Sequence, residues 1–471
     1  MEMEEQQKVE VATTEATEEP TATPYKYQLL TKDNKDLLAE FEKTSLKENR
    51  LRALLSQWLK MENVSVLMGS GCSLSHKGKL LSTMETEILN EICKEVDESE
   101  GEKTKVSENP SEESKSENPI KKLILHRRKN SEKQNFEEWL STLTTTYHLI
   151  SSKDNGVSSV TWELCGQQVT ITEQQLKTFL EKIQSGVFKK CTLQLPNPTA
   201  ESGTGHHSLM GKLVARDATL GRAHVFTLNY DTLIEQSLDH LSIAYMDGFS
   251  GKVEAVFDPS SYGLDIYYPG NVSEGRVKRY ERFLHLYKLH GSINWRFDGN
   301  RLVRKEAHET PSDITMGIMP TSNKFSQTQL TPYSHLFRIF QDKLQQPQTF
   351  FLIAGYGFGD EHVNRIIDDA MLSNPSLAML VVEPFPSKKI EDRISAYNVV
   401  GERAFLFTLE EKEQATRKSE TPKVFLDEFA RDVLPDVKWL DEWFKLRKLE
   451  KSIESTNPAT ALKKQEEKDA D

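Results

Sequence analysis

Two short apolar segments of the 471-residue sequence end in polar residues whose types suit acid–base chemistry. Val225–Leu228 is followed by Asn229 and Asp231, and Leu284–Leu289 is followed by His290. Buried parallel strands have this pattern, and open α/β sheets bind ligands at the carboxyl ends of their strands. An imidazole can accept a proton near neutral pH, and an amide can hold a water molecule. We therefore expect these polar side chains to meet in one crevice.

Each of these residues also has a plainer structural interpretation. Asn229 could be a turn residue, and His290 could be a buried histidine that is hydrogen-bonded in the core. Asn229 and Asp231 lie two residues apart, so in extended backbone their side chains would share a face. In a catalytic site, Asn229 would hold a water molecule through its amide and Asp231 would orient a neighbouring group.

Two glycine-rich segments also follow predicted strands and precede predicted helices. Gly69–Ser73 (GSGCS) comes after Val64–Met68, and Gly355–His362 (GYGFGDEH) comes after Phe350–Ala354. Glycines at such positions let the backbone approach a diphosphate, although a plain tight turn would have the same composition. Neither segment contains the Gly-Lys-Ser/Thr of a Walker motif, which argues against an NTPase.

The sequence does not favour a metal site. Asp360, Glu361 and His362 are adjacent, and adjacent side chains diverge around a helix. Asp360 has instead the type and position of a helix N-cap. The chain has four widely separated cysteines, Cys72, Cys93, Cys165 and Cys191. No two of them form a Cys-x-x-Cys pair, so we expect free thiols, without a zinc site or a disulfide framework.

The hydrophobic pattern predicts an α/β fold. Strands are predicted at 64–68, 225–228, 284–289, 350–354, 378–382 and 405–407. Helices are predicted at 51–59, 136–150, 174–187, 209–218, 363–371, 425–434 and 439–449, and a further helix is predicted to begin at Ser82. The strand–helix–strand unit at 350–382 has short links, which is typical of a parallel βαβ unit. We therefore predict a Rossmann-like parallel sheet flanked by helices, with a helical insertion layer at about 119–220.

The predicted domain organisation is an acidic disordered tail at 1–24, one α/β domain at 25–410 with a disordered insertion at 97–118, C-terminal helices at 411–451 and a charged tail at 452–471. The net charge of −12 argues against general nucleic-acid binding. The acidic N-terminus lacks the apolar segment of a secretory signal, and no stretch is long and apolar enough to span a bilayer. We therefore expect a cytoplasmic protein without membrane contact.

Four segments, taken in order, resemble the sirtuin catalytic domain: LMGSGCS (67–73), TLNYD (227–231), KLHGS (288–292) and IAGYGFGDEHVN (353–364). A closer resemblance is to the zinc-less sirtuin-like NAD+ hydrolases of bacterial anti-phage defence, and it is carried by DGFSG (247–251), FDPSSY (257–262), KLHGSINW (288–295) and IMPTSNKF (318–325). Together these matches cover about residues 50–410.

This resemblance implies a role for each matching residue. The NAD diphosphate would contact Gly69, Ser70, Gly71 and Ser73. The adenosine side would be lined by Gly355, Tyr356 and Gly357, and Glu383 would reach the adenine ribose. Asn229 would position the attacking water, Asp231 would hold the nicotinamide ribose, and His290 would be the essential base. NAD is expected as a substrate, and no metal is expected.

Departures from the sirtuin deacylases favour water as the acceptor. The two Cys pairs of their zinc ribbon are absent, and Lys77–Ser82 (KGKLLS) stands where their cofactor loop reads approximately GIPDFR. Leu228 stands where they have Gln, and their Phe-Phe-Gly-Glu segment is missing. The resemblance therefore implies an NAD+ glycohydrolase that releases nicotinamide and ADP-ribose.

The same resemblance implies a biological setting. The enzyme would be a regulated effector that depletes NAD+ in abortive infection, as a homo-oligomer and with a HerA-type ATPase or another defence-system protein as a possible partner. The apolar helix faces at 37–59 and 425–449 are either oligomer surfaces or ordinary core. Two other functions stay open at this point: an NAD-dependent deacylase or ADP-ribosyltransferase, and a non-enzymatic scaffold or sensor that binds NAD or ADP-ribose.

Overall fold

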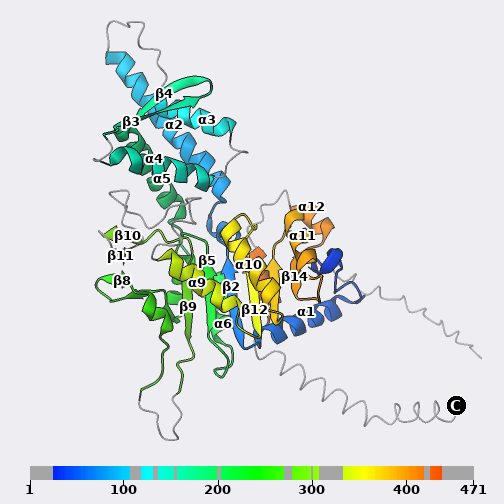
Figure 1. Ribbon diagram of the computed structural model, residues 1–471. Helices are drawn as coiled ribbons and strands as arrows, with labels where there is room; N and C mark the ends of the chain where they lie inside the picture. The colour runs from blue at the N-terminus through cyan, green and yellow to red at the C-terminus, as the bar shows by residue number, and fades with distance from the viewer. Residues whose placement is uncertain are drawn as a thin grey trace, which may run out of the picture.

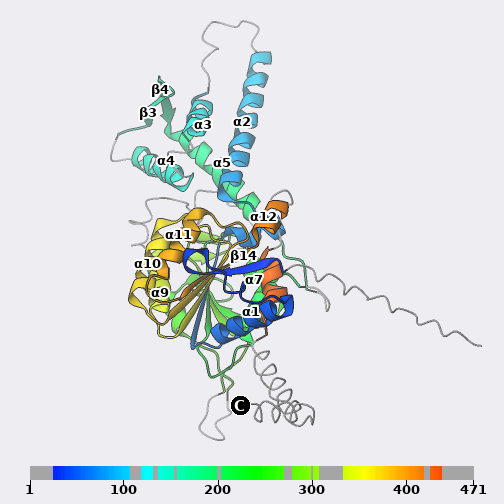
Figure 2. The ribbon, with the colours of Figure 1, turned by 90° about the vertical axis from the view of Figure 1, so that its right-hand side faces the viewer.

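The computed structural model describes residues 25–106, 118–130, 136–152, 156–198, 203–269, 278–298, 301–306, 332–417 and 425–436. Both predicted tails, the predicted helix at 439–449 and the IMPTSNKF motif at 318–325 lie outside these residues. The chain forms a sheet domain and a projecting lobe, residues 81–191, which rises from one edge of it (Figures 1 and 2). None of the described helices has the length and hydrophobicity that crossing a membrane requires.

The centre of the sheet domain is an eight-stranded sheet with the order β1-β14-β13-β12-β2-β5-β9-β6. Its strands are β1 (Tyr27–Leu30), β2 (Asn63–Met68), β5 (Ala223–Thr227), β6 (Ala244–Met246), β9 (Phe283–Lys288), β12 (Thr349–Ala354), β13 (Leu377–Val382) and β14 (Ala404–Leu409). All neighbouring strands are parallel except β1 and β14. The order β9-β5-β2-β12-β13-β14 is that of a doubly wound Rossmann sheet, whose switch point lies between β2 and β12.

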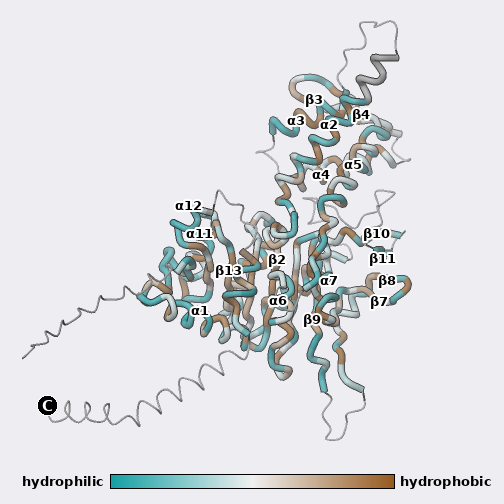
Figure 3. Tube along the Cα trace, turned by 180° about the vertical axis from the view of Figure 1, so that it is seen from behind, coloured by the Kyte–Doolittle hydropathy of each residue, from teal (hydrophilic) through white to brown (hydrophobic). Residues whose placement is uncertain are grey.

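The predicted Rossmann-like sheet is thus confirmed, and each of the six predicted strands is present. These strands are buried on both faces, which explains their continuous apolar sequences. The edge strands β1 and β6 were not predicted, because four and three residues are too short to show a periodic pattern. In Figure 3 hydrophobic residues lie along the central strands and also along the helices of the projecting lobe.

Helices cover both faces of the sheet. One face packs against α1 (Thr44–Leu59), α6 (Gly205–Val214), α7 (Leu233–His240), α13 (Phe425–Asp427) and η5 (Glu428–Val433). The other face packs against α9 (Tyr333–Leu344), α10 (Glu361–Ser373) and α11 (Lys388–Tyr397). The buried apolar residues of α1 and of α13 with η5 are part of this core, so in the described residues core packing accounts for these apolar faces.

The projecting lobe has a core of its own. It consists of α2 (Leu81–Val106), α3 (Pro119–Lys129), α4 (Phe136–Ser151), the hairpin β3 (Ser159–Leu164) and β4 (Gln167–Thr172), and α5 (Glu173–Cys191). Tyr230 and Ile293, from the loops after β5 and β9, belong to the same hydrophobic cluster. The backbone N–H of Ile293 also donates to the carbonyl of Tyr230 at 3.0 Å. The lobe is therefore anchored beside the ends of these two strands.

The lobe corrects three predictions. The disordered insertion was predicted to begin at residue 97, but α2 continues to Val106, because Glu and Lys favour extension of a helix that has already formed. The predicted helical layer at about 119–220 contains an unpredicted β-hairpin, although the apolar residues of its strands, SVTWEL and QQVTIT, alternate with polar ones as is typical of a strand. The last helix of that segment was predicted at 209–218, but α6 begins and ends four residues earlier and packs in the sheet domain.

A second, smaller sheet was not predicted. Its order is β10-β11-β8-β7, formed by β7 (Phe249–Ser250), β8 (Ala255–Phe257), β10 (Trp295–Asp298) and β11 (Arg301–Arg304). An ion pair joins Arg304 of β11 to Asp247, which precedes β7. Strands of two to four residues have too few positions for a sequence pattern to identify them.

The two glycine turns after β2 and β12 pack directly against each other. A Cβ atom on Gly69 would lie 2.5 Å from the carbonyl oxygen of Gly355, and one on Gly71 would lie 2.8 Å from the Gly355 Cα. A Cβ on Gly355 would lie 2.5 Å from the backbone nitrogen of Cys72, and Gly355 has φ +61°. Only glycine fits at these three contacts, so the turns interlock at the switch point of the sheet.

Replacing Gly355 with Ala tests this interlocking. We expect Gly355→Ala to lower the free energy of unfolding by at least about 2 kcal/mol, because the new methyl group would meet backbone atoms at a positive φ. Gly359→Ala is the matched control, because nothing lies within 4 Å of its Cβ position. The measurement is the thermal and urea unfolding midpoint of the two variants. Equal midpoints would contradict the interlocking.

Candidate active site

A cavity of about 670 Å³ opens at the carboxyl ends of the central strands. This volume is typical of small-molecule and cofactor sites. Its lining comes from five strand ends, namely Gly69, Ser70, Gly71 and Cys72 after β2, Asn229 and Tyr230 after β5, His290 after β9, Gly355, Tyr356, Gly357, Gly359 and Asp360 after β12, and Glu383 after β13. The cavity also contacts the start of the lobe through Leu80 and Leu81.

The structure brings nearly all the predicted site residues together in this cavity. Every predicted cofactor-binding or catalytic residue lines it except Ser73 and Asp231. Both of these are buried behind the lining, where their side chains contact each other. Asn229 and Asp231 nevertheless share one face, as expected, because both side chains contact the hydroxyl group of Ser73.

Asn229 is held in place by the turn after β2. Its amide nitrogen donates to the carbonyl of Gly69 at 2.9 Å and to Ser73 Oγ at 3.0 Å. Ser73 Oγ in turn donates to Asp231 Oδ2 at 2.6 Å, and Asp231 Oδ1 accepts from the Leu233 N–H at 3.1 Å. Since the amide donor is engaged, the Asn229 side chain faces a ligand with its carbonyl oxygen as the acceptor.

The glycine turn after β2 is less open to a diphosphate than its sequence indicates. The N–H of Gly69 donates to Ala354 O, and the N–H of Gly71 donates to Gly355 O, both at 2.9 Å. These donors serve the packing of the two turns. Ser70 is exposed at the rim of the cavity, so its hydroxyl is the polar group of this turn that is best placed to meet a phosphate.

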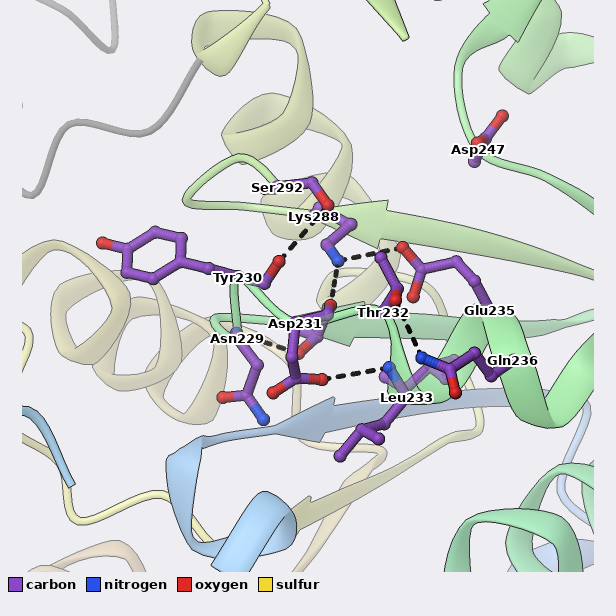
Figure 4. A network of polar contacts seen from close by, with 12 residues as sticks. Asn229, Tyr230, Asp231, Thr232, Leu233, Glu235, Gln236, Asp247, Lys288 and Ser292 are labelled. Atoms are coloured by element: carbon purple, nitrogen blue, oxygen red, sulfur yellow. Dashed lines mark hydrogen bonds and ion pairs between the residues drawn. The ribbon is translucent and has the colours of Figure 1, made fainter. Parts of the chain in front are cut away.

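A buried ion pair ties the end of β9 to the start of α7, and sequence reasoning did not identify it. Lys288 Nζ donates to the backbone carbonyl of Asp231 and to Glu235 Oε1, the latter at 2.9 Å (Figure 4). The side chains of Lys288 and Glu235 are only 3% and 12% exposed. Burial raises the pKa of Glu235, and the ammonium group of Lys288 opposes that shift. A lysine inside a buried strand sequence was the available signal, because a buried charge needs a partner.

His290 faces a carboxylate that the sequence assigned to helix capping alone. His290 Nε2 lies 2.9 Å from Asp360 Oδ2, and the two side chains are 9% and 8% exposed. The predicted cap is also present, because Asp360 Oδ1 accepts from the backbone N–H groups of His362 and Val363, at 2.9 and 3.4 Å, at the start of α10. No sequence signal could pair residues 70 positions apart.

Glu383 lies half-buried at the opposite end of the cavity from the loops after β5 and β9, because β13 and β9 are separated in the sheet by three strands. Burial raises the pKa of its carboxyl group to about 7, and a hydrogen bond from the backbone of Phe385 partly opposes this shift. A ribose hydroxyl donating to the carboxylate would supply the interaction that water no longer provides.

Lys288→Ala tests the contact between β9 and α7. We expect a loss of about 3 kcal/mol in the free energy of unfolding, because the substitution leaves Glu235 buried without its cation. Lys278→Ala is the control; it breaks an exposed ion pair with Glu281, and such pairs contribute about 0–1 kcal/mol. The measurement is urea denaturation of both variants. A small, equal effect of both substitutions would contradict a structural role for the buried pair.

The raised pKa of Glu383 predicts a pH-dependent stability of the free protein. The folded-state pKa of about 7 lies above the unfolded value of about 4.3, so this contribution is fully present below the unfolded pKa and is lost as the pH rises through 7. Glu383→Gln should therefore stabilise the protein, relative to wild type, more at pH 8 than at pH 5. The measurement is the unfolding midpoint at both pH values, with the exposed Glu402→Gln as the control. The same difference at both pH values would contradict the raised pKa.

Part of the chain is similar to a known family. Residues 223–400, from β5 to the end of α11, match the family model described as a SIR2-like domain. No curated protein matched the chain. Among solved structures, one described as "Structural Basis for the Mechanism and Regulation of Sir2 Enzymes" matches with 11% identity over 85% of this chain and 99% of that chain, at a TM-score of 0.33. A mutant Sir2 homologue in complex with 2'-O-acetyl ADP ribose matches with 9% identity over 83% of this chain and 96% of that chain, also at 0.33.

The matched range contains Asn229, His290, Asp360 and Glu383, whereas β2 and its glycine turn precede it. Among the residues that the structure describes, no group of three or more His, Cys, Asp or Glu side chains is placed to hold a metal ion. The match to the SIR2-like domain model at residues 223–400 therefore includes four of the five strand ends that line the switch-point cavity.

Proposed function

We propose that this chain is an NAD+ glycohydrolase, which cleaves the bond between nicotinamide and ribose with water as the acceptor. The observation that carries the proposal is that Asn229 and His290, from two different strand ends, line one cavity with both glycine turns and Glu383. The SIR2-like domain supports NAD as the substrate. The choice of water as the acceptor rests on the departures of this sequence from the sirtuin deacylases.

The order of the strands suggests how NAD+ would lie. Glu383 at the end of β13 would accept hydrogen bonds from the adenine ribose, and the turns after β12 and β2 would face the diphosphate. The nicotinamide ribose would then lie beside β5 and β9, next to Asn229 and His290. The positions of the strands support this direction. Glu383, whose carboxyl group has a raised pKa, lies at one end of the cavity, and the His290 imidazole lies at the other.

The chemistry follows from this placement. The bond between C1' of the ribose and the nicotinamide nitrogen breaks, and its electron pair leaves with nicotinamide. A water molecule whose proton is directed at the Asn229 amide oxygen forms the new bond to C1', and its other proton passes to His290. Leu80, Leu81 and Leu228 line the cavity and would exclude bulk water around the positively charged transition state, so that fixed dipoles act with little screening.

The biological setting is a further part of this proposal and rests on the sequence resemblance alone. The enzyme would be an effector of anti-phage defence that depletes cellular NAD+, and it would act as a homo-oligomer or with a HerA-type ATPase. An enzyme of this kind has to be inactive until infection, so assembly or a phage component would control access to the cavity.

The direct test is release of nicotinamide from NAD+ by the purified protein, measured by chromatography. We expect His290→Ala and Asn229→Ala each to lower kcat by about 10²-fold or more, because each removes a group that acts on the attacking water. His148→Ala, on the exposed end of α4, is the matched control and should leave kcat unchanged.

Two outcomes would replace the proposal with another function. Formation of an acyl-ADP-ribose that depends on an added acyl peptide would indicate a deacylase, and transfer to a protein would indicate an ADP-ribosyltransferase. No turnover by the wild type, together with normal cellular function of His290→Ala, would indicate a sensor that only binds the nucleotide.

A further inference from the structure

Asp360 uses its two carboxylate oxygens for two different purposes. Oδ1 accepts the backbone N–H groups of His362 and Val363 at the start of α10, at 2.9 and 3.4 Å. Oδ2 lies 2.9 Å from Nε2 of His290, which comes from the end of β9 on the other side of β2 and β5. A helix cap requires only one oxygen, so the second contact needs a separate explanation.

The backbone that delivers Asp360 is held in place more firmly than a surface cap requires. Tyr356 Oη accepts from the Asp360 N–H and lies 3.1 Å from the Asp360 carbonyl, and it donates to Asn364 Oδ1 at 3.0 Å. Asn364 and Lys389 both donate to the carbonyl of Phe358, at 3.0 and 2.9 Å. Tyr356 and Asn364 are 6% and 3% exposed, so this network is buried.

The turn is also strained. Phe358 has φ +55°, in the left-handed region that a bulky side chain rarely adopts, and its side chain is fully buried. Strain of this kind persists only where the surrounding contacts impose it, and it gathers at functional sites. The hydrogen bonds to the Phe358 carbonyl impose it here, and the result is that the Asp360 carboxylate is aimed across the cavity edge at His290.

We infer that Asp360 is a positioning residue, which orients the His290 imidazole and keeps the proton on Nε2, so that Nδ1 is the nitrogen that receives a proton during the reaction. A carboxylate offers only acceptors, and a neutral imidazole carries its proton on one nitrogen. Nε2 therefore donates to Oδ2, and the lone pair is on Nδ1. The inference deepens the proposed function and rests on it for the reaction that Nδ1 would serve.

The step can be written with its balance. As the bond between C1' and nicotinamide breaks and the water oxygen bonds to C1', a proton moves from that water to Nδ1 of His290. The ring is then an imidazolium whose Nε2–H still donates to Asp360, and the carboxylate stabilises the new positive charge as it does in hydrolases that use a histidine–aspartate pair. Nicotinamide leaves neutral, and the imidazolium later returns its proton to solvent.

Three substitutions separate positioning from capping. Asn and Ser are both good N-cap residues, so Asp360→Asn and Asp360→Ser should retain the helix cap, whereas Asp360→Ala loses it. In Asp360→Asn the amide nitrogen can face His290 as a donor, which favours the opposite tautomer of the ring. We expect Asp360→Asn to lower kcat by about 10²- to 10⁴-fold, with KM and the thermal unfolding midpoint close to those of the wild type.

The capping role by itself predicts a different pattern. Asn and Ser would then support wild-type kcat, and only Asp360→Ala would lose stability and activity together. That pattern would overturn the inference. Asp360→Glu adds a check by conservative replacement, because it keeps a carboxylate near His290. It should retain more activity than Asp360→Asn, although Glu is the poorer cap.

The tautomer can be measured without any enzymatic assay. Protein labelled with ¹⁵N-histidine, with the His290→Ala spectrum used for assignment, reports which ring nitrogen carries the proton. We expect Nε2–H in the wild type and Nδ1–H in Asp360→Asn. A wild-type ring protonated at Nδ1 would overturn the inference even if nicotinamide is released. The expected tautomer in a wild type that releases no nicotinamide would instead refute the proposed function and leave the positioning of His290 by Asp360 supported.

Discussion

The interlocking of two backbone turns at the switch point between β2 and β12 is the constraint on which the site depends. Gly69 and Gly71 lie so close to Gly355 that no side chain fits between them. Because their N–H groups are used in this contact, the turns define the floor of the cavity more than they supply donors to it. Asn229 is anchored on the same floor through the carbonyl of Gly69. A disturbance of the turns would therefore reach the chemistry directly.

The polar groups of the site are positioned by side chains from other parts of the chain. Asn229 is held through Ser73, the loop that carries Asn229 is held by Lys288, and His290 faces Asp360. All these partners are buried, where an unpaired charge or hydrogen-bonding group is costly, so each contact restricts its neighbour to one arrangement. The Asn229 amide and the His290 ring, whose orientation the proposed chemistry requires, are thus fixed before a ligand binds.

The projecting lobe is part of the site because of where it is attached. Its core includes Tyr230 and Ile293, which follow the β5 and β9 ends directly. Leu81, the first residue of α2, lines the cavity as well. Any movement of the lobe would therefore shift the walls of the cavity beside Asn229 and His290. This physical connection is a route by which a partner bound to the lobe could control the proposed activity.

The sequence by itself determined the parallel sheet, because strands buried on both faces are continuous apolar runs that end abruptly in glycine or polar residues. It also determined most of the cavity lining, since the ends of parallel strands converge on one edge. Only the tertiary structure decided the partners: that Asp231 lies behind Ser73, that Lys288 joins Glu235, and that Asp360 reaches His290. These pairs join residues that are 53 to 158 positions apart in the sequence. A local sequence pattern cannot predict such contacts, because they depend on which strands lie side by side in the folded sheet.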